Sequence, residues 1–374
     1  MKIEKVQKIQ DWHRLNKANI LKGRYLPLAD IEPLFKALKF PFQVSHIGTS
    51  FNKLPINKVT IGTGEMHVLI WSQMHGNEST GTKALFDLFN FLKLPKEFSL
   101  LRDSILDNCT LTFVPILNPD GALAYTRVNA QEIDLNRDAV ELKAPESKIL
   151  HNVLREFKPD YCFNLHDQRT IFTVGKTTKS ATISFLAPSE DEARTITDGR
   201  KETMNVIVAM KEILQKLIPG QIGRYTDEFY PTATGDNFQK AGHNTILIEA
   251  GHFKNDYDRE QVRFYNFLSL LMGIDYLSTG NREIDKHSDY FEIPNNSKKY
   301  YDVICKNIFN KENDKMIDVG VLFKEVLDKK TIIFDPEIKK VGNLAKYAAN
   351  KVIDCQGEIV NNETELHFLV KKLL

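Results

Sequence analysis

Apolar residues in this chain form short continuous runs that alternate with longer stretches of helical spacing. Residues 65–72 (EMHVLIWS) are one such run, which is typical of a strand buried on both faces. Residues 81–95 follow with apolar side chains at helical spacing and end at a proline, which indicates a helix. The remaining elements are predicted on the same grounds: two short strands within 42–64, strands at 110–119, 161–167, 182–188 and 244–251, and helices at 145–159, 191–217 and 259–277.

Strands that alternate with helices in this way predict an α/β fold with a mixed, mostly parallel central sheet covered by helices on both faces. The chain has 374 residues, whereas single cores stop growing at about 250–300 residues. Its sequence turns polar and rich in turn residues at 278–299. We therefore predict a first domain at 1–280, a linker or excursion at 281–299, and a small α+β or β-rich domain of unknown role at 300–374.

Charge and composition exclude several classes of partner. Lys and Arg (50) balance Asp and Glu (49) without a long block of one sign, so neither nucleic acid nor a membrane is a predicted partner. The N-terminus is charged throughout, and no stretch approaches the roughly 18 apolar residues of a membrane span, so a cytoplasmic location is predicted. The cysteines lie far apart with no C-x-x-C spacing, which indicates buried free thiols: Cys109, Cys162, Cys305 and Cys355.

Polar side chains stand at the carboxyl ends of three predicted strands. His75 and Glu78 follow the first of these strands, and His166 and Glu249 lie at the ends of two later ones. In α/β sheets this edge opens into the loops that carry sites. Two imidazoles and one carboxylate, with a fourth position left open, suit a catalytic zinc ion. Gly76 is expected to let the backbone turn so that both flanking side chains point at one ion.

Each of these residues also has a purely structural interpretation. His75 and Glu78 are common in loops and caps, and a glutamate near a helix N-terminus is favoured by the helix dipole. His166 alone is typical of a half-buried, hydrogen-bonded histidine, and Glu249 of a salt bridge at the edge of the core. Their shared placement and the loop described next favour the metal site.

The loop-rich segment 118–138 carries Arg127, Asn136 and Arg137 after a predicted strand. Two guanidiniums and an amide are suited to holding a carboxylate and to polarising a carbonyl. Singly, such residues are typical of turns and surfaces. Beside a metal they would anchor a substrate next to an electrophile.

Five short segments, in order and at suitable spacing, resemble motifs of the zinc carboxypeptidase family, to which carboxypeptidase A belongs. GTSFNKLPI is similar to the early G-x-S-x-x-x-x-P-I segment, HGNES to the H-G-x-E metal motif, and NLHD to the second histidine motif. NPDG and DLNRD resemble the N-P-D-G and D-L-N-R motifs. The resemblance covers roughly residues 40–280 and is closest in style to short bacterial members.

The resemblance implies one zinc ion per chain, bound by His75, Glu78 and His166. It also implies that Glu249 is the general base and then the general acid of a hydrolysis. A zinc ion would make water acidic enough to attack at neutral pH.

For the substrate, the resemblance implies that Arg127 polarises the scissile carbonyl and that Asn136 and Arg137 bind the terminal carboxylate. In the family an aromatic hydroxyl on a mobile loop closes over the substrate. Tyr230 is the candidate for this role, with Tyr225 behind it.

Some positions depart from the family's usual pattern. Asp167 and Gln168 follow the zinc histidine, where small hydroxyl residues are common. The ending IEAGH around the catalytic glutamate is also unusual, and we expect His252 to reach the site. The region near Asp236 and Asn237 does not align, so side-chain preference is not predicted.

The resulting hypothesis is a zinc metallopeptidase of the carboxypeptidase type, which cleaves an amide bond next to the free carboxylate of a peptide or small peptide-like substrate. An N-acyl amino acid deacylase of the aspartoacylase or succinylglutamate desuccinylase type is the alternative, because those enzymes share the metal frame and commonly append a C-terminal domain. A non-catalytic peptide- or metal-binding module is a third hypothesis. Such a module would be expected to lack a metal ligand or the catalytic glutamate, and this sequence has all of them. The expected partner is a peptide or an acylated amino acid, and no oligomeric state is predicted.

Overall fold

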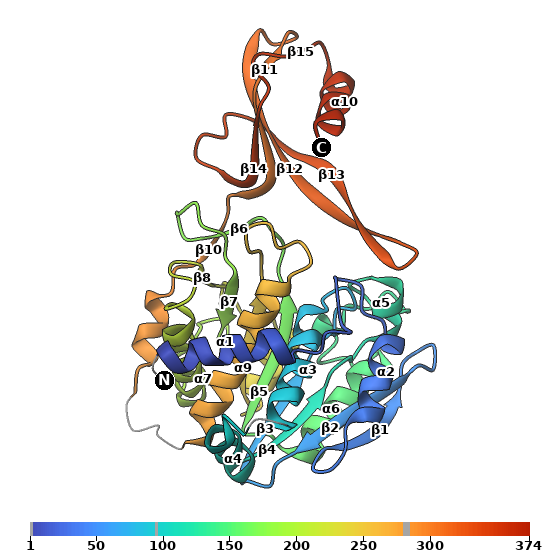
Figure 1. Cartoon of the computed structure of the whole chain (residues 1–374), viewed down its shortest axis with the longest axis vertical. Coiled ribbons are helices and arrows are strands. Elements are labelled where there is room, and N and C mark those ends of the chain that lie inside the picture. Colours follow the sequence, from blue (N-terminus) through green and yellow to red (C-terminus); the bar gives the residue numbers. More distant parts are fainter. Residues whose placement is uncertain (1–2, 94–95, 280–284) are drawn as a thin grey trace.

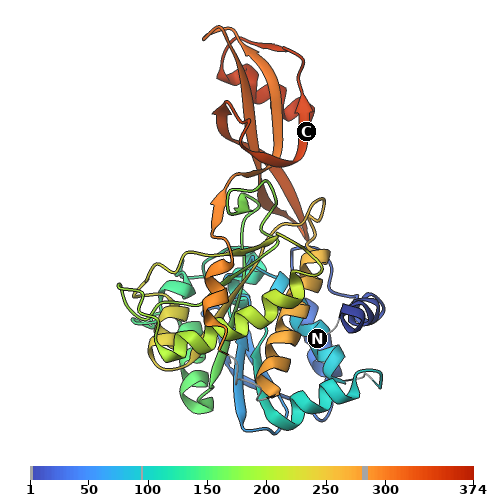
Figure 2. The same cartoon turned by 90° about the vertical axis from the view of Figure 1, so that its left-hand side faces the viewer.

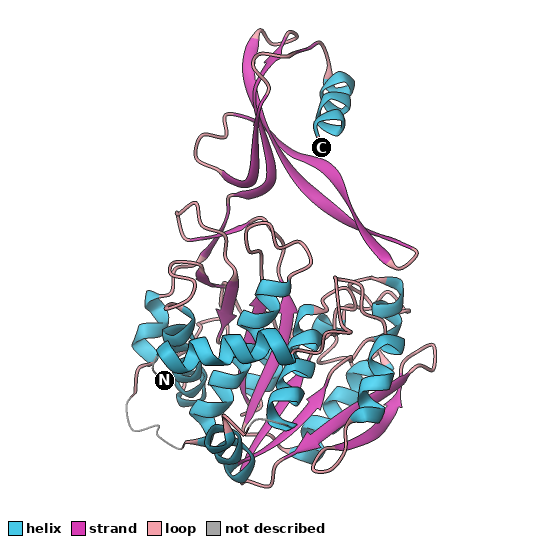
Figure 3. Cartoon of the chain, viewed as in Figure 1, coloured by secondary structure: helices cyan, strands magenta, loops and turns pink. Residues whose placement is uncertain are grey.

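The computed structural model describes residues 3–93, 96–279 and 285–374. An eight-stranded sheet forms its centre, with helices on both faces (Figures 1 and 3). In spatial order the strands are β1 (Gln43–Thr49), β2 (Pro55–Ile61), β4 (Cys109–Val114), β3 (Met66–Trp71), β5 (Tyr161–Asp167), β9 (Asn244–Ala250), β7 (Ile183–Leu186) and β8 (Ile222–Arg224).

The middle of the sheet is parallel. Strands β4, β3, β5 and β9 run in one direction, while β1, β2 and β7 introduce antiparallel pairs. The predicted fold class, a mixed and mostly parallel sheet between helices, is confirmed. Because β3, β5 and β9 are parallel, with β5 between the other two, their carboxyl ends meet at one edge of the sheet.

Helices cover the sheet in two layers. One face is covered by the helices that share a hydrophobic core with Val68 and Ile70: α1 (Ile3–Asn16), α2 (Leu28–Ala37), α3 (Thr80–Lys93), α4 (Ser99–Asn108), α7 (Asp198–Leu214) and α9 (Glu260–Ser278). The opposite face carries α6 (Pro145–Phe157) and α8 (Thr234–Lys240). Within the described ranges, no helix is both long enough and apolar enough to cross a lipid bilayer.

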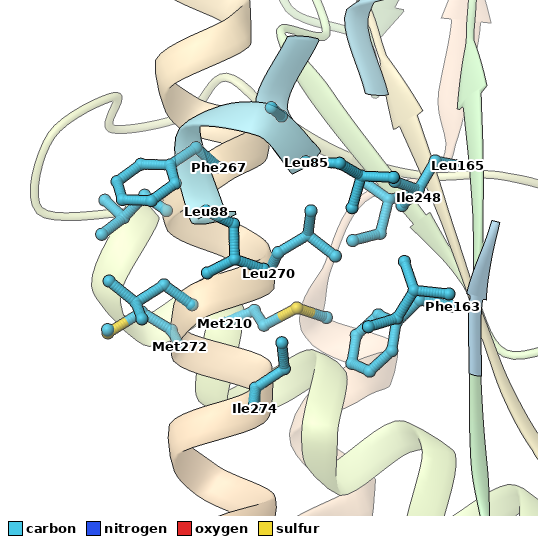
Figure 4. Packing of buried hydrophobic residues seen from close by; sticks show 14 of the residues in the cluster. Leu85, Leu88, Phe163, Leu165, Met210, Ile248, Phe267, Leu270, Met272 and Ile274 are labelled. Atoms are coloured by element: carbon cyan, nitrogen blue, oxygen red, sulfur yellow. The ribbon is translucent and has the colours of Figure 1, made fainter. Parts of the chain in front are cut away.

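Strand β3 shows why its sequence is continuously apolar. Val68 and Ile70 point into the core beneath α3 and α9, whereas Leu69 and Trp71 point into the second core beneath α6. Successive side chains of a strand face opposite sides, so a strand between two layers needs apolar residues at every position. Figure 4 shows the larger core, where Phe163 and Leu165 of β5 pack against side chains of α3, α7 and α9.

The helix expected at 191–217 is shorter than predicted. Helix α7 begins at Asp198, because the hydroxyl of Thr197 accepts a hydrogen bond from the Arg200 N–H and caps the helix there. Helices α1, α2 and α4 were not predicted from the sequence. In α1 the buried positions Val6 and Ile9 lie among many charged residues, which hides the apolar stripe.

Residues 300–374, the C-terminal segment, form a second sheet with strand order β13-β12-β11-β14, and β15 pairs with β11. This confirms the expected β-rich or α+β character. The elements are β11 (Tyr300–Asn310), β12 (Lys315–Asp328), β13 (Thr331–Gly342), β14 (Ala348–Asp354), β15 (Ile359–Val360) and α10 (Glu363–Leu373). Figures 1 and 2 show this sheet projecting from one end of the large α/β part.

The predicted linker at 281–299 falls partly outside the described residues, which resume at Asp285. The rest contains the 3₁₀ helix η2 (His287–Glu292) and β10 (Asn296–Lys298). Strand β10 pairs with β6 (Phe172–Val174) of the α/β part. The domain boundaries themselves stay a prediction.

Candidate metal and substrate site

The structure brings His75, Glu78 and His166 together at the carboxyl edge of the sheet. Glu78 places Oε1 2.9 Å from His75 Nδ1 and Oε2 2.9 Å from His166 Nδ1, and the two Nδ1 atoms are 3.1 Å apart. All three side chains are buried. Ligand atoms around a tetrahedral zinc ion with bonds of about 2.0 Å are separated by about 3.3 Å. The observed spacing is therefore close to that of a zinc site.

The chemistry of these donors also fits a cation. His75 Nε2 lies 3.0 Å from Asp134 Oδ1, and a neutral ring that donates a proton there keeps its lone pair on Nδ1. Lone pairs of two imidazoles and a carboxylate then converge on one point, where a divalent cation offsets their repulsion. Three protein ligands with one open side are typical of catalytic rather than structural zinc.

Asp134 is a residue of the site that the sequence analysis missed. It accepts hydrogen bonds from His75, from Arg127 Nε at 3.0 Å and from the Asn136 N–H at 2.9 Å. Burial alone would raise the pKa of Asp134, but the hydrogen bonds and charges of His75 and Arg127 hold it well below the ordinary value. The signal was present in DLNRD, where an acid precedes the expected substrate residues. A carboxylate behind a ligating histidine orients the ring toward its metal.

We expect Asp134→Asn to weaken zinc binding by about 10- to 100-fold, because an amide orients His75 without the negative charge that raises the basicity of the ring. Competition with a zinc chelator measures the effect. Asp138→Asn is the matched control. Asp138 lies on the same loop but accepts hydrogen bonds from the backbone N–H groups of Lys143 and Ala144. Equal zinc affinity in Asp134→Asn and the wild type would contradict the assignment.

Gly76 serves a different purpose from the one expected. Its φ is not in the left-handed region, so a special turn does not require glycine here. A Cβ atom at this position would lie 1.9 Å from the carbonyl carbon of Gly121. The loop that carries His75 and Glu78 therefore packs directly against the backbone of α5 (Pro119–Ala124), which begins within the NPDG segment.

Glu249 stands at the end of β9, directly beside His166 in the sheet register. It lines the same pocket as the three metal-ligand candidates, a cavity of about 490 Å³. Burial, followed by the negative charges of Glu78 and Asp167, raises the pKa of the Glu249 carboxyl well above its ordinary value. Among the described residues its carboxyl has no hydrogen-bond partner, so the group is available to a ligand.

The three residues expected to bind the substrate line this pocket as well. Arg127 Nη1 lies 3.5 Å from Glu78 Oε1, which places the guanidinium beside the metal-ligand candidates. Asn136 Oδ1 accepts a hydrogen bond from the Thr234 N–H at 3.3 Å, and Arg137 Nη1 donates to the Asn136 carbonyl oxygen at 2.8 Å. Arg127 and Arg137 thus lie on the wall next to the metal-ligand candidates.

Both candidate tyrosines line the pocket. Tyr230 is 42 % exposed, its ring centroid is 5.1 Å from the Arg137 guanidinium, and its hydroxyl lies 3.5 Å from Glu228. Tyr225 is half-buried, and burial together with the charges of Glu249 and Glu78 raises the pKa of its phenol. Tyr230 is the exposed tyrosine that a loop movement could bring inward.

The residues that depart from the family's usual pattern have different surroundings in the structure. The Asp167 carboxylate pairs with Arg259 at 3.2 Å, and Gln168 donates to the Ala181 carbonyl oxygen. Asp236 lines the pocket, and burial raises its pKa to about 6. Asn237 instead donates to the backbone carbonyl oxygens of Pro231 and Ala233, which precede its helix.

The expectation that His252 reaches the site is wrong. Strand β9 ends at Ala250, and the chain then turns away from the pocket. The His252 ring is buried between Tyr257 and Tyr300, with ring centroids 5.3 and 5.9 Å away. His252 therefore belongs to the packing between the α/β part and the C-terminal segment.

Burial, assisted by the positive charge of Arg259, lowers the pKa of His252 to about 4. The unfolded chain binds this proton more readily, so the stabilising contribution is complete above pH 6.5 and is lost as the pH falls toward 4. We expect this residue alone to cost about 2 kcal/mol between pH 7 and pH 5. Urea unfolding of metal-free wild type and His252→Gln at both values tests this, and equal losses would exclude it.

Comparisons with known proteins relate part of this chain to carboxypeptidases. Residues 37–141 match the zinc carboxypeptidase family model. Carboxypeptidase 2 of Trichophyton rubrum is 21% identical over 188 residues, which cover 50% of this chain and 31% of that protein. Carboxypeptidase SOL1 of Arabidopsis thaliana is 30% identical over 136 residues, which cover 32% of this chain and 28% of that protein. The matches thus span less than a third of these relatives.

Solved structures show the same fold. The carboxypeptidase A of Helicoverpa armigera superposes with a TM-score of 0.55 at 14% identity, over 74% of this chain and 82% of that chain. A metallo-carboxypeptidase of Burkholderia cenocepacia gives a TM-score of 0.52 at 17% identity, over 71% of this chain and 70% of that chain.

Proposed function

We propose that this chain, which carries a zinc carboxypeptidase-family region at residues 37–141, is a zinc-dependent hydrolase of the carboxypeptidase type. Its substrate would be a peptide or small peptide-like molecule with a free carboxylate, cleaved at the neighbouring amide bond. The observation that carries the proposal is the convergence of His75, Glu78 and His166 on one point of a pocket that also holds Glu249 and Arg127.

His75, Glu78 and His166 would hold the zinc ion. Zinc supplies Lewis acidity at this point, which makes water more acidic and a carbonyl more electrophilic. Glu249 faces the same space and would accept the proton of the attacking water. It would then deliver that proton to the departing amine, so that water and amide become a carboxylic acid and an amine.

Arg127 and Arg137 would bind different parts of the substrate. Arg127 lies against Glu78 and would donate hydrogen bonds to the oxyanion that develops on the scissile carbonyl, a contribution of about 3–4 kcal/mol for one such donor. Arg137 and Asn136 lie side by side and would bind the terminal carboxylate. A fixed carboxylate positions the neighbouring amide for attack.

Asp236 and Glu228 give the pocket two further carboxyls. Neither is a candidate metal ligand. The pocket therefore has both cationic groups for a carboxylate and acidic groups for another part of the substrate.

A metal analysis joined to a substrate panel tests the proposal. Purified protein is assayed for bound zinc and then for release of C-terminal amino acids from short peptides. We expect about one zinc per chain, peptide hydrolysis, loss of activity with a chelator, and recovery on adding zinc.

The panel also includes N-acyl amino acids without a peptide bond. Preferential hydrolysis of these compounds would replace the peptidase by the deacylase alternative. Bound metal without hydrolysis of any compound would indicate a binding module.

A further inference from the structure

Glu325 of the C-terminal segment lies against residues of the α/β part. Figure 1 shows the hairpin of β12 and β13 slanting from the second sheet toward α5. Glu325 of β12 is 10% exposed, and its Oε1 lies 2.9 Å from Arg24 Nη2, while its Oε2 accepts a hydrogen bond of 2.6 Å from the Tyr125 hydroxyl. Arg24 is itself only 7% exposed. The hairpin therefore makes a buried ion pair with the far end of the chain.

Aromatic packing fixes the same hairpin in place. The Tyr257 ring lies 5.6 Å from Phe323 and 5.2 Å from Phe334, which belong to β12 and β13. The Tyr257 hydroxyl donates to Asp302 of β11 at 3.0 Å. Tyr257 lies on the loop after Glu249, so the C-terminal segment contacts the chain just beyond the candidate general base.

A second buried guanidinium, that of Arg259, lines the same small cavity as Glu325 and Arg24. Arg259 pairs with Asp167 at 3.2 Å and donates to the carbonyl oxygens of Ala250 and Gln168, each at 2.6 Å. Burial and the positive charge of Arg24 lower the pKa of Arg259, and the negative charges of Asp167 and Glu325 oppose that shift. Among the described residues, Arg24 makes its ion pair with Glu325 and Arg259 makes its ion pair with Asp167, so removal of Glu325 would leave the buried Arg24 guanidinium without a carboxylate partner.

Asp167 connects this cluster to the metal ligands. It follows His166 in β5, and its N–H donates to Glu78 Oε2 at 3.1 Å. Its carboxylate accepts a hydrogen bond of 2.7 Å from the Thr80 hydroxyl, two residues after Glu78. A small cavity of about 10 Å³ is lined by residues of both groups, among them Glu78, Asp167, Arg259 and Glu325.

We propose that Glu325 is a positioning residue for the metal site: it neutralises Arg24 and Arg259, so that Asp167 holds Glu78 in the geometry that binds zinc. This inference rests on the proposed function and gives the C-terminal segment a role in it. Glu325 acts through Arg24, Arg259 and Asp167 and is not one of the metal-ligand candidates. Its removal would leave an uncompensated positive charge beside a site that must hold a divalent cation.

The test measures zinc affinity of the full chain by competition with a fluorescent chelator. We expect Glu325→Gln to bind zinc about 10-fold more weakly, at the lower end of the effect of groups behind a ligand. Zinc-saturated Glu325→Gln should keep its kcat within about twofold, because no group that touches substrate has changed. Unchanged zinc affinity in a folded Glu325→Gln protein would overturn the proposal.

Two controls separate charge from structure. Glu337→Gln alters the same hairpin at an exposed pair with Lys339 and should leave zinc affinity unchanged. The double variant Arg24→Gln/Glu325→Gln restores charge balance with two amides that can bond to each other, and it should recover most of the lost affinity. A purely structural role predicts no recovery, and that result would also overturn the proposal.

Circular dichroism confirms that each variant is folded. If Glu325→Gln does not fold, Glu325→Asp provides the same test, because its shorter side chain withdraws the carboxylate from Arg24. It should bind zinc more weakly than the wild type, and equal affinity would exclude the positioning role. A wild-type chain that binds no zinc would instead refute the proposed function, and this inference with it.

Discussion

Glu249→Gln should retain bound zinc and lose most turnover. The residue stands beside His166 in the sheet register but is not one of the three donors that converge on the metal point. An amide cannot accept the proton of the attacking water, and general acid–base catalysis contributes about 10²- to 10⁴-fold to rates. We therefore expect kcat to fall by about 10²- to 10⁴-fold, whereas the zinc content should be unchanged. Steady-state kinetics and metal analysis on one preparation measure both quantities.

Glu228→Gln is the matched control, since Glu228 also lines the pocket but is not one of the metal-ligand candidates. It should alter KM more than kcat if it contacts substrate at all. Turnover in Glu249→Gln equal to that of the wild type would show that another group is the base. Loss of zinc from Glu249→Gln would show instead that the carboxyl is a ligand.

His166→Ala should abolish zinc binding. The His166 Nδ1 atom lies 2.9 Å from Glu78 and 3.1 Å from His75 Nδ1, so its removal takes away one of three ligands. We expect bound zinc to fall from about one ion per chain to near zero, with activity falling in parallel. Metal content after gel filtration measures the loss.

His46→Ala provides the comparison for His166→Ala. His46 is an exposed residue of β1, at the sheet edge away from the site. It should keep its zinc and its activity. Full zinc retention by His166→Ala would contradict the metal site, whereas zinc loss in both variants would point to general unfolding.

Most of the sheet could be predicted because its strands have a clear signal. The β3 segment is apolar at every position, since Leu69 and Trp71 face one core while Val68 and Ile70 face the other. The N-terminal helix α1 gave no comparable signal. Only one of its faces is buried, and its charged side chains dominate the pattern.

The candidate site was predictable where residues follow strand ends. His166 and Glu249 occupy the penultimate positions of parallel neighbouring strands, so topology alone brings them together. Asp134 was missed because its role depends on how a long loop folds back onto His75. His252 was misplaced because the sequence predicts the end of the strand but does not show that the chain then turns toward Tyr300.

The ion pair between Arg24 and Glu325 joins residues near opposite ends of the chain. Glu325 is synthesised after all the strands of the central sheet, so Arg24 must stay hydrated while the N-terminal parts begin to fold. Such distant pairings close late and slowly because a long loop must be ordered first. Nascent chains that stall before residue 325 would thus expose an unpaired arginine, and the Arg24–Glu325 ion pair can form only after residue 325 has been synthesised.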